Sequence, residues 1–164
     1  MEWQGVEIHP DTPPQGRPLT ELFRPEDIER MMRHLRIAGA PFGIAFADRP
    51  LLSNSRLALQ AAEYAREHGR FPQFHSATFS AYFSLGLDIG DPDVLRQIAR
   101  DAGLDADGMM DAIKSGRYLP KLDEMRQEAG LRGLTGIPTF VVGDKKTIVG
   151  AEPLDVFRKV LRSL

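Results

Sequence analysis

Cysteine is the first residue type to consider, because a thiolate can act as a nucleophile, a redox group or a metal ligand. The 164 residues contain no cysteine. The sequence therefore predicts no disulfide, no Cys-x-x-Cys pair and no thiol–disulfide exchange by the side chains of this chain.

The other side chains that could bind a metal or attack a substrate lack the spacing that such chemistry needs. The four histidines are His9, His34, His68 and His75. No two of them stand four residues apart on one predicted helix, as they would in a zinc site. Asp88, Asp91 and Asp93 lack the glycine and glutamate of a calcium loop, and no serine lies in a nucleophile elbow. We expect no metal, no cofactor and no catalytic residue.

Composition limits the partners and the location. The formal net charge is -2, which gives no electrostatic reason to expect nucleic acid or an anionic membrane. No apolar run approaches the ~20 residues of a membrane span. The start of the chain lacks the basic region and apolar core of a signal peptide, so we expect a cytoplasmic protein.

The stretch from Thr135 to Gly143 carries the most specific pattern. Two glycines bracket an apolar run rich in β-branched residues, which predicts a short buried strand. Pro138 stands at its first position, where a proline is tolerated in a strand. A second strand over Thr147–Val149 and a helix opened by Pro153 complete a strand, hairpin, strand and helix unit.

This unit resembles the C-terminal half of a DsbA-like thioredoxin fold. The resemblance rests on Gly136-Ile137-Pro138-Thr139-Phe140 followed by Ile148-Val149-Gly150-Ala151-Glu152-Pro153. It is strongest to the FrnE-type branch, which is described as predicted dithiol–disulfide oxidoreductases. The resemblance implies a cis bond before Pro138. It also implies a substrate-binding loop formed by Gly136, Ile137, Pro138 and Thr139.

The start of the chain extends the resemblance. Residues 3–9 alternate loosely between apolar and polar, which predicts a strand, and a proline-rich loop follows over residues 10–18. The pair resembles the FrnE-type family just after its second strand. Family members carry their cysteines before this point, so the resemblance implies that the active-site half of the fold is missing here.

Between these parts the sequence predicts helices. The expected ranges are 25–38, 53–68, a helix beginning near Phe74, 91–102, 105–115 and 119–129, from apolar periodicity with proline, aspartate and glycine at the ends. The aromatic cluster Phe71, Phe74, Phe79, Tyr82 and Phe83 is predicted to be core. So are Met31, Met32, Met109, Met110 and Met125, as are the alanines of residues 57–65.

The predicted fold class is therefore α/β: an incomplete, DsbA-like thioredoxin sheet with a large all-helical insertion. Residues 1–24 and 132–164 would form the thioredoxin-like part, and residues 25–131 the helical insertion.

Three interpretations of function stay open. The first is a DsbA/FrnE-like protein that is redox-inactive as it stands and retains peptide or partner binding at the Pro138 loop. The second is a relative of 2-hydroxychromene-2-carboxylate isomerase or kappa-class glutathione transferase, although Ala151-Glu152-Pro153-Leu154 departs from the Gln-Asp-Arg-Leu type sequence of that group. The third is a fragment of a full-length disulfide oxidoreductase.

A homodimer is also expected. In the family's fold the absent first strand lies between the second strand and the hairpin, so its loss would leave two unpaired strand edges. Such edges invite pairing with another chain. We expect a two-fold symmetric dimer through the thioredoxin-like half, with Trp3, Val6 and Ile8 near the interface.

Overall fold

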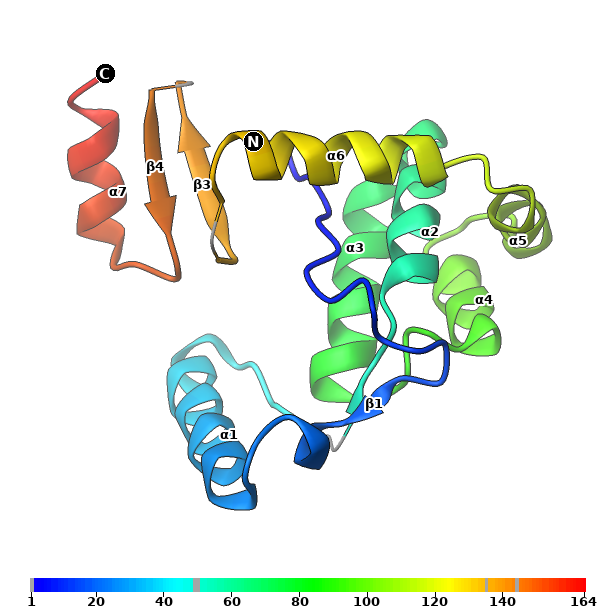
Figure 1. Cartoon of the computed structure of the whole chain (residues 1–164), viewed down its shortest axis with the longest axis horizontal. Coiled ribbons are helices and arrows are strands. Elements are labelled where there is room, and N and C mark those ends of the chain that lie inside the picture. Colours follow the sequence, from blue (N-terminus) through cyan, green and yellow to red (C-terminus); the bar gives the residue numbers. More distant parts are fainter. Residues whose placement is uncertain (1, 49–50, 135, 144) are drawn as a thin grey trace. The chain divides into compact units, whose positions relative to one another are not determined.

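The structure is a computed structural model that describes residues 2–48, 51–134, 136–143 and 145–164. It forms two compact units, Met1–Met125 and Arg126–Leu164, and the boundary between them falls within helix α6 (Leu119–Leu131). The first unit is mainly helical, and the second is a hairpin with a further helix (Figure 1). No helix in the described ranges is long and apolar enough to cross a membrane.

The first unit follows the predicted order of helices. Its elements are β1 (Arg17–Pro18), the 3-10 helix η1 (Leu19–Glu21), α1 (Pro25–Gly39), the 3-10 helix η2 (Ala40–Phe42), β2 (Leu51–Leu52), α2 (Arg56–Glu67), α3 (Phe71–Phe79), the π-helix η3 (Ser80–Ser84), α4 (Pro92–Asp101), α5 (Ala106–Lys114) and the start of α6. The predicted helices are confirmed, although α3 begins earlier than expected. The stretch predicted to be all-helical contains one short strand, because β2 pairs antiparallel with β1.

Side-chain caps explain where two of these helices begin. The Asp91 carboxylate accepts a hydrogen bond from the backbone N–H of Asp93 at 2.8 Å, which caps α4. Asp105 does the same for α5 and accepts from the N–H groups of Asp107 and Gly108, each at 3.1 Å. Each cap satisfies backbone donors that the first turn of a helix leaves unpaired.

Helices α2 to α5 enclose the core of the first unit. Phe74, Leu95 and Met109 are its largest fully buried side chains. The predicted small-residue face of α2 is confirmed, because Ala58, Ala61 and Ala65 are all buried within the core. Small residues let neighbouring helices approach closely, and α2 contacts α3, α4 and α5.

Helix α1 contributes less to a core than its periodicity predicts. Met32 is buried, but Met31 is 40% exposed and Ile37 is 68% exposed. The core prediction is therefore wrong for Met31. It is confirmed for the other methionines named above, namely Met32, Met109, Met110 and Met125.

The aromatic cluster divides between core and surface. Phe74 is buried, but Phe79 is 50% exposed and Phe83 is 38% exposed, so the core prediction is wrong for these two rings. The reason is helical spacing. Residues 71, 75, 79 and 83 share one side of the helix, and their rings form a surface row with successive centroids 5.4, 4.4 and 5.6 Å apart.

The strand predicted over residues 3–9 is absent from the described residues, so that prediction is wrong. The segment is held by side chains of α2 instead. Arg66 Nη2 donates to the Trp3 carbonyl at 2.7 Å, and Arg56 Nη2 lies 3.2 Å from a Glu7 carboxylate oxygen. Apolar alternation favours a strand only where a partner strand supplies backbone hydrogen bonds, and here a helix surface takes that place.

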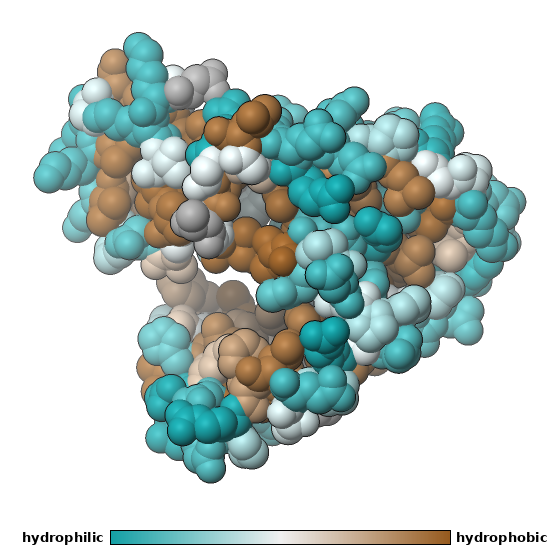
Figure 2. All heavy atoms as spheres, in the orientation of Figure 1, coloured by the Kyte–Doolittle hydropathy of each residue, from teal (hydrophilic) through white to brown (hydrophobic). Residues whose placement is uncertain are grey.

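The second unit holds the predicted hairpin and helix. Strand β3 (Thr139–Val142) pairs antiparallel with β4 (Lys146–Val149), and α7 (Leu154–Leu161) follows. Apolar residues are visible on the surface of this unit in Figure 2. The domain limits expected from the sequence, residues 1–24 with 132–164 and residues 25–131, stay a prediction.

Candidate functional site

The predicted substrate-binding loop lies at the start of β3, and Thr135 before it falls outside the described residues. The Ile137–Pro138 peptide bond is cis. The Thr139 hydroxyl donates to the Gly136 carbonyl at 2.5 Å, which closes the loop on itself. A Cβ at Gly136 would lie 3.3 Å from the Val149 side chain, so a larger residue there would need a small shift of Val149.

The register of the hairpin decides which backbone groups of β3 are free to bind. The Gly150 N–H donates to the Pro138 carbonyl at 2.7 Å, which continues the β3–β4 register by one further residue pair. Antiparallel strands alternate between hydrogen-bonded and non-hydrogen-bonded residue pairs. The N–H and C=O groups of Thr139 and Val141 therefore point to the outer edge of β3, where no strand pairs with them within the described ranges.

Helix α7 covers one face of the hairpin, and the opposite face is exposed. Phe140 and Ile148 face α7, where the Phe140 and Phe157 rings meet edge to face at 4.9 Å. Ile148 is 5% exposed. The opposite face carries Val141 and Val149, which are 40% and 47% exposed. An apolar face beside an unpaired strand edge is an arrangement that can receive an extended peptide.

Ile137 adds to this surface. Its side chain is 63% exposed just before β3, two residues ahead of Thr139, the first residue whose backbone groups point outward. The loop and the edge of β3 are continuous through Gly136, Ile137, Pro138 and Thr139, and the role of these residues in substrate binding stays a prediction. Sequence reasoning missed the contribution of Val141 and Val149, because alternation alone does not reveal which face a helix covers.

The charged and titratable groups with shifted pKa values belong to the helical unit. Burial raises the pKa of Tyr118, and the hydrogen bond that its hydroxyl donates to Glu67 at 2.7 Å adds to the shift. Burial lowers the pKa of His75. No group of metal-binding side chains occurs in the described parts of the chain. The Pro138 loop itself therefore offers backbone hydrogen bonding and apolar contact.

Comparisons with known proteins identify the family. The family model for the DSBA-like thioredoxin domain matches residues 1–162. This chain belongs to the DSBA-like thioredoxin domain family. The predicted fold is thereby confirmed, with its mixed α/β elements and its large share of helix.

Individual proteins are also similar to this chain. The uncharacterized protein YwbO of Bacillus subtilis is 27% identical over 169 residues, which cover 98% of this chain and 80% of YwbO. A 2-hydroxychromene-2-carboxylate isomerase of Sphingobium xenophagum is 33% identical over 85 residues, which cover 52% of this chain and 44% of the isomerase. A probable DsbA oxidoreductase of Streptomyces coelicolor has a TM-score of 0.87 at 22% identity, with 98% of this chain and 73% of that structure covered. At that identity the structural likeness supports the fold.

Proposed function

We propose that this chain is a redox-inactive, peptide-binding member of the DSBA-like thioredoxin family, within its FrnE-type branch. The observation that carries the proposal is the unpaired outer edge of β3 beside exposed Ile137 and the uncovered face of Val141. Main-chain hydrogen bonds along such an edge bind extended segments, and the side chains beside it select among them.

The absence of cysteine supports the redox part of the proposal. Thiol–disulfide exchange requires a thiolate that attacks a disulfide sulfur, and the 164 residues supply none. In an insulin reduction assay with dithiothreitol, this chain should leave the uncatalysed rate unchanged. Faster turbidity than in the protein-free control would refute this part.

Peptide binding is tested by amide shifts. An unstructured, cysteine-free peptide of Val, Thr and Ser residues should shift the amide signals of Ile137, Thr139 and Val141 on titration. The decisive variant is Val141→Pro, which removes an outward N–H without removing a β3–β4 hydrogen bond, as an edge proline can. It should abolish the shifts.

Thr147→Pro is the matched control. Thr147 stands opposite Val141 in the register, so its N–H points to the outer edge of β4. The substitution introduces the same residue and also removes one outward N–H, but it lies on the other edge of the hairpin. We expect peptide binding to survive in Thr147→Pro. Equal loss in both variants, or no shifts with the unmodified chain, would refute the proposal.

A homodimer belongs to the same proposal, although the strand that placed Trp3, Val6 and Ile8 at its interface is not formed. Its support is now the uncovered face of Val141 and Val149, for which a second copy of the chain and a peptide would compete. A stable dimer should bury more than about 1,000 Å² in total. Sedimentation equilibrium at micromolar concentration should give twice the chain mass. A monomer would refute the homodimer.

A second candidate is isomerase activity of the 2-hydroxychromene-2-carboxylate type. The partial match to the Sphingobium xenophagum isomerase favours it. Incubation with 2-hydroxychromene-2-carboxylate, followed by absorbance, tests it directly. Conversion above the uncatalysed rate would replace the peptide-binding proposal as the main function.

A further inference from the structure

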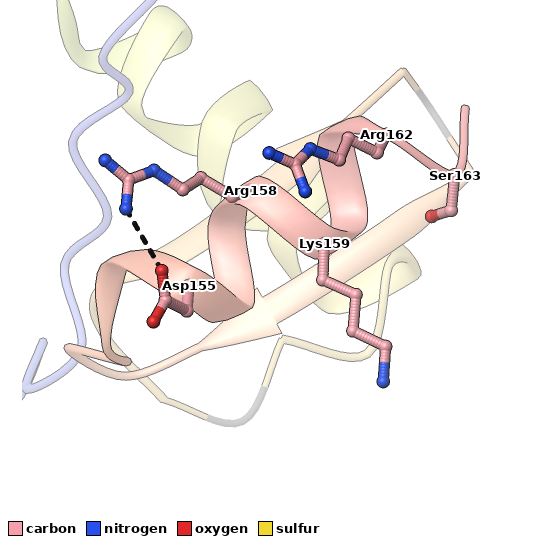
Figure 3. Close-up of a pocket in the computed structure, with 5 residues that line it drawn as sticks. All are labelled: Asp155, Arg158, Lys159, Arg162 and Ser163. Atoms are coloured by element: carbon pink, nitrogen blue, oxygen red, sulfur yellow. Dashed lines mark hydrogen bonds and ion pairs between the residues drawn. The ribbon is translucent and has the colours of Figure 1, made fainter.

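The outward face of α7 carries a basic hollow in the second unit. It has a volume of about 480 Å³ and is lined by Asp155, Arg158, Lys159, Arg162 and Ser163 (Figure 3). These residues recur at the spacing that places them on one side of a helix. The sheet-facing side of the same helix is marked by Phe157, which contacts Phe140. The hollow is therefore a surface of α7 that the hairpin leaves open.

The cations of the basic hollow are only partly neutralised by the chain. Arg158 Nη1 lies 3.0 Å from Asp155 Oδ1. Lys159 and Arg162 form no ion pair with any residue that the structure describes. A further ammonium group stands beside them, because Lys146 Nζ donates to the Ser163 hydroxyl at 2.6 Å.

Several basic residues of the helical unit form ion pairs with carboxylates. Arg117 pairs with Glu67 at 3.0 Å, and Arg33 pairs with Glu29 at 2.8 Å. The charge balance of the two units differs, since residues 126–164 contain seven Lys and Arg against four Asp and Glu, whereas residues 1–125 contain 14 against 19. Positive charge is thus concentrated on the second unit.

The arrangement of the cations favours carboxylates as ligands. In Figure 3 the guanidinium groups of Arg158 and Arg162 extend from α7 in the same direction, and Lys159 extends on the other side. A guanidinium group binds a carboxylate through two parallel hydrogen bonds. Two such groups one helical turn apart can hold successive acidic side chains of a bound segment.

Two exposed leucines of α7 lie beside the basic hollow, on the side where Arg158 lies. Leu154 and Leu161 are 62% and 59% exposed. At about 100° per residue they lie next to Arg158 around the helix and about 10 Å apart along it. The face therefore combines an apolar stripe with a basic stripe, which matches an amphipathic segment with leucine-like and acidic residues.

We infer that the basic hollow of α7 is a docking site for an acidic, amphipathic segment of a partner protein. A long polyanion such as a nucleic acid is disfavoured by the formal net charge of the whole chain, which is -2. A short acidic segment can confine its contacts to α7. The site is separate from the β3 edge and goes beyond the peptide binding proposed above.

The test is fluorescence anisotropy with a labelled peptide of about 14 residues, four helical turns long, made of Glu with two leucines seven positions apart. The full chain should bind it, and the same peptide with Gln for Glu should not bind. Because each exposed ion pair contributes modestly, Lys159→Gln with Arg162→Gln should weaken binding about fivefold or more.

The matched control is Arg70→Gln with Arg100→Gln, which changes the net charge equally at exposed positions of the helical unit. It should leave the affinity unchanged, and Val141→Pro should also leave it unchanged. Equal loss in both double variants, equal binding of the Gln peptide, or tighter binding of a single-stranded oligonucleotide would overturn the inference. Unchanged circular dichroism confirms that each variant is folded.

Discussion

The helical unit and the C-terminal unit differ in how completely each covers its apolar residues. The first encloses Phe74, Leu95 and Met109 among its own helices. In the second, Ile148 is buried while Val149 and Leu161 are 47% and 59% exposed. The comparison indicates that the helical unit has a core of its own, and that the hairpin and α7 leave much of their apolar surface exposed. Both proposed binding sites lie on the less covered unit.

The largest expected effect is in the helical core. Leu95 is 0% exposed, so Leu95→Ala removes buried methyl groups and leaves a cavity. We expect the free energy of unfolding to fall by about 2–5 kcal/mol. Urea unfolding followed by circular dichroism measures this change.

Leu161→Ala is the matched control, because the same truncation on exposed α7 should change stability by no more than about 0.5 kcal/mol. Hydrogen exchange sharpens the comparison. Amides of α4 should exchange through the global unfolding reaction, and those of β3 through easier local opening. Equal protection of α4 and β3 amides would mean that the two units unfold as one.

A smaller effect is expected at the link between α2 and the segment after α5. The Tyr118 hydroxyl donates to Glu67 at 2.7 Å, and Tyr118→Phe removes this bond. Since the Glu67 side chain is 43% exposed, water can replace the lost donor, and we expect a loss of about 1 kcal/mol. Urea unfolding of the variants Tyr118→Phe, Glu67→Gln and both together isolates the pair.

The raised pKa of Tyr118 makes the free energy of unfolding depend on pH in the alkaline range. Its pKa lies above its ordinary value of 10.0 because it is buried and donates to Glu67. The unfolded chain therefore loses this proton first as the pH rises above 10.0, and the stability from Tyr118 is lost in that range. Tyr118→Phe should flatten the alkaline part of the stability curve. An unaltered alkaline slope in the variant would contradict the assignment.

The smallest expected effect is an acid transition at the surface row of aromatic rings. Burial lowers the pKa of His75 below 6.5. The stability from neutral His75 is present above pH 6.5 and is lost as the pH falls through its lower folded-state pKa. Trp3, the single tryptophan, lies 4.8 Å from the His75 ring, so its fluorescence should report the titration.

His75→Gln should remove this fluorescence transition. His34→Gln, at an exposed position of α1, should leave it in place. A transition at or above pH 6.5 would show that burial does not control His75.

The sequence by itself determined the features that depend on neighbours along the chain. Asp91 followed by Pro92 marks a helix start because the cap accepts a hydrogen bond two residues ahead. Gly69, with φ of 66°, ends α2 in a backbone conformation that other residues rarely adopt. The hairpin of β3 and β4 and the loop at Pro138 followed from the same kind of local pattern and from the family resemblance.

Only the tertiary structure decided which of these elements have partners. Residues 3–9 alternate like a strand, but Arg66 of α2 binds the Trp3 carbonyl in place of a neighbouring strand. Phe79 and Phe83 are as apolar as Phe74, yet they fall on the side of the helix that faces away from the core. Likewise, Lys159 and Arg162 have the sequence pattern of ordinary charged residues at a helix end. Only the structure shows that neither forms an ion pair with a carboxylate among the described residues. Burial and pairing depend on residues far away in sequence, and local pattern carries no information about them.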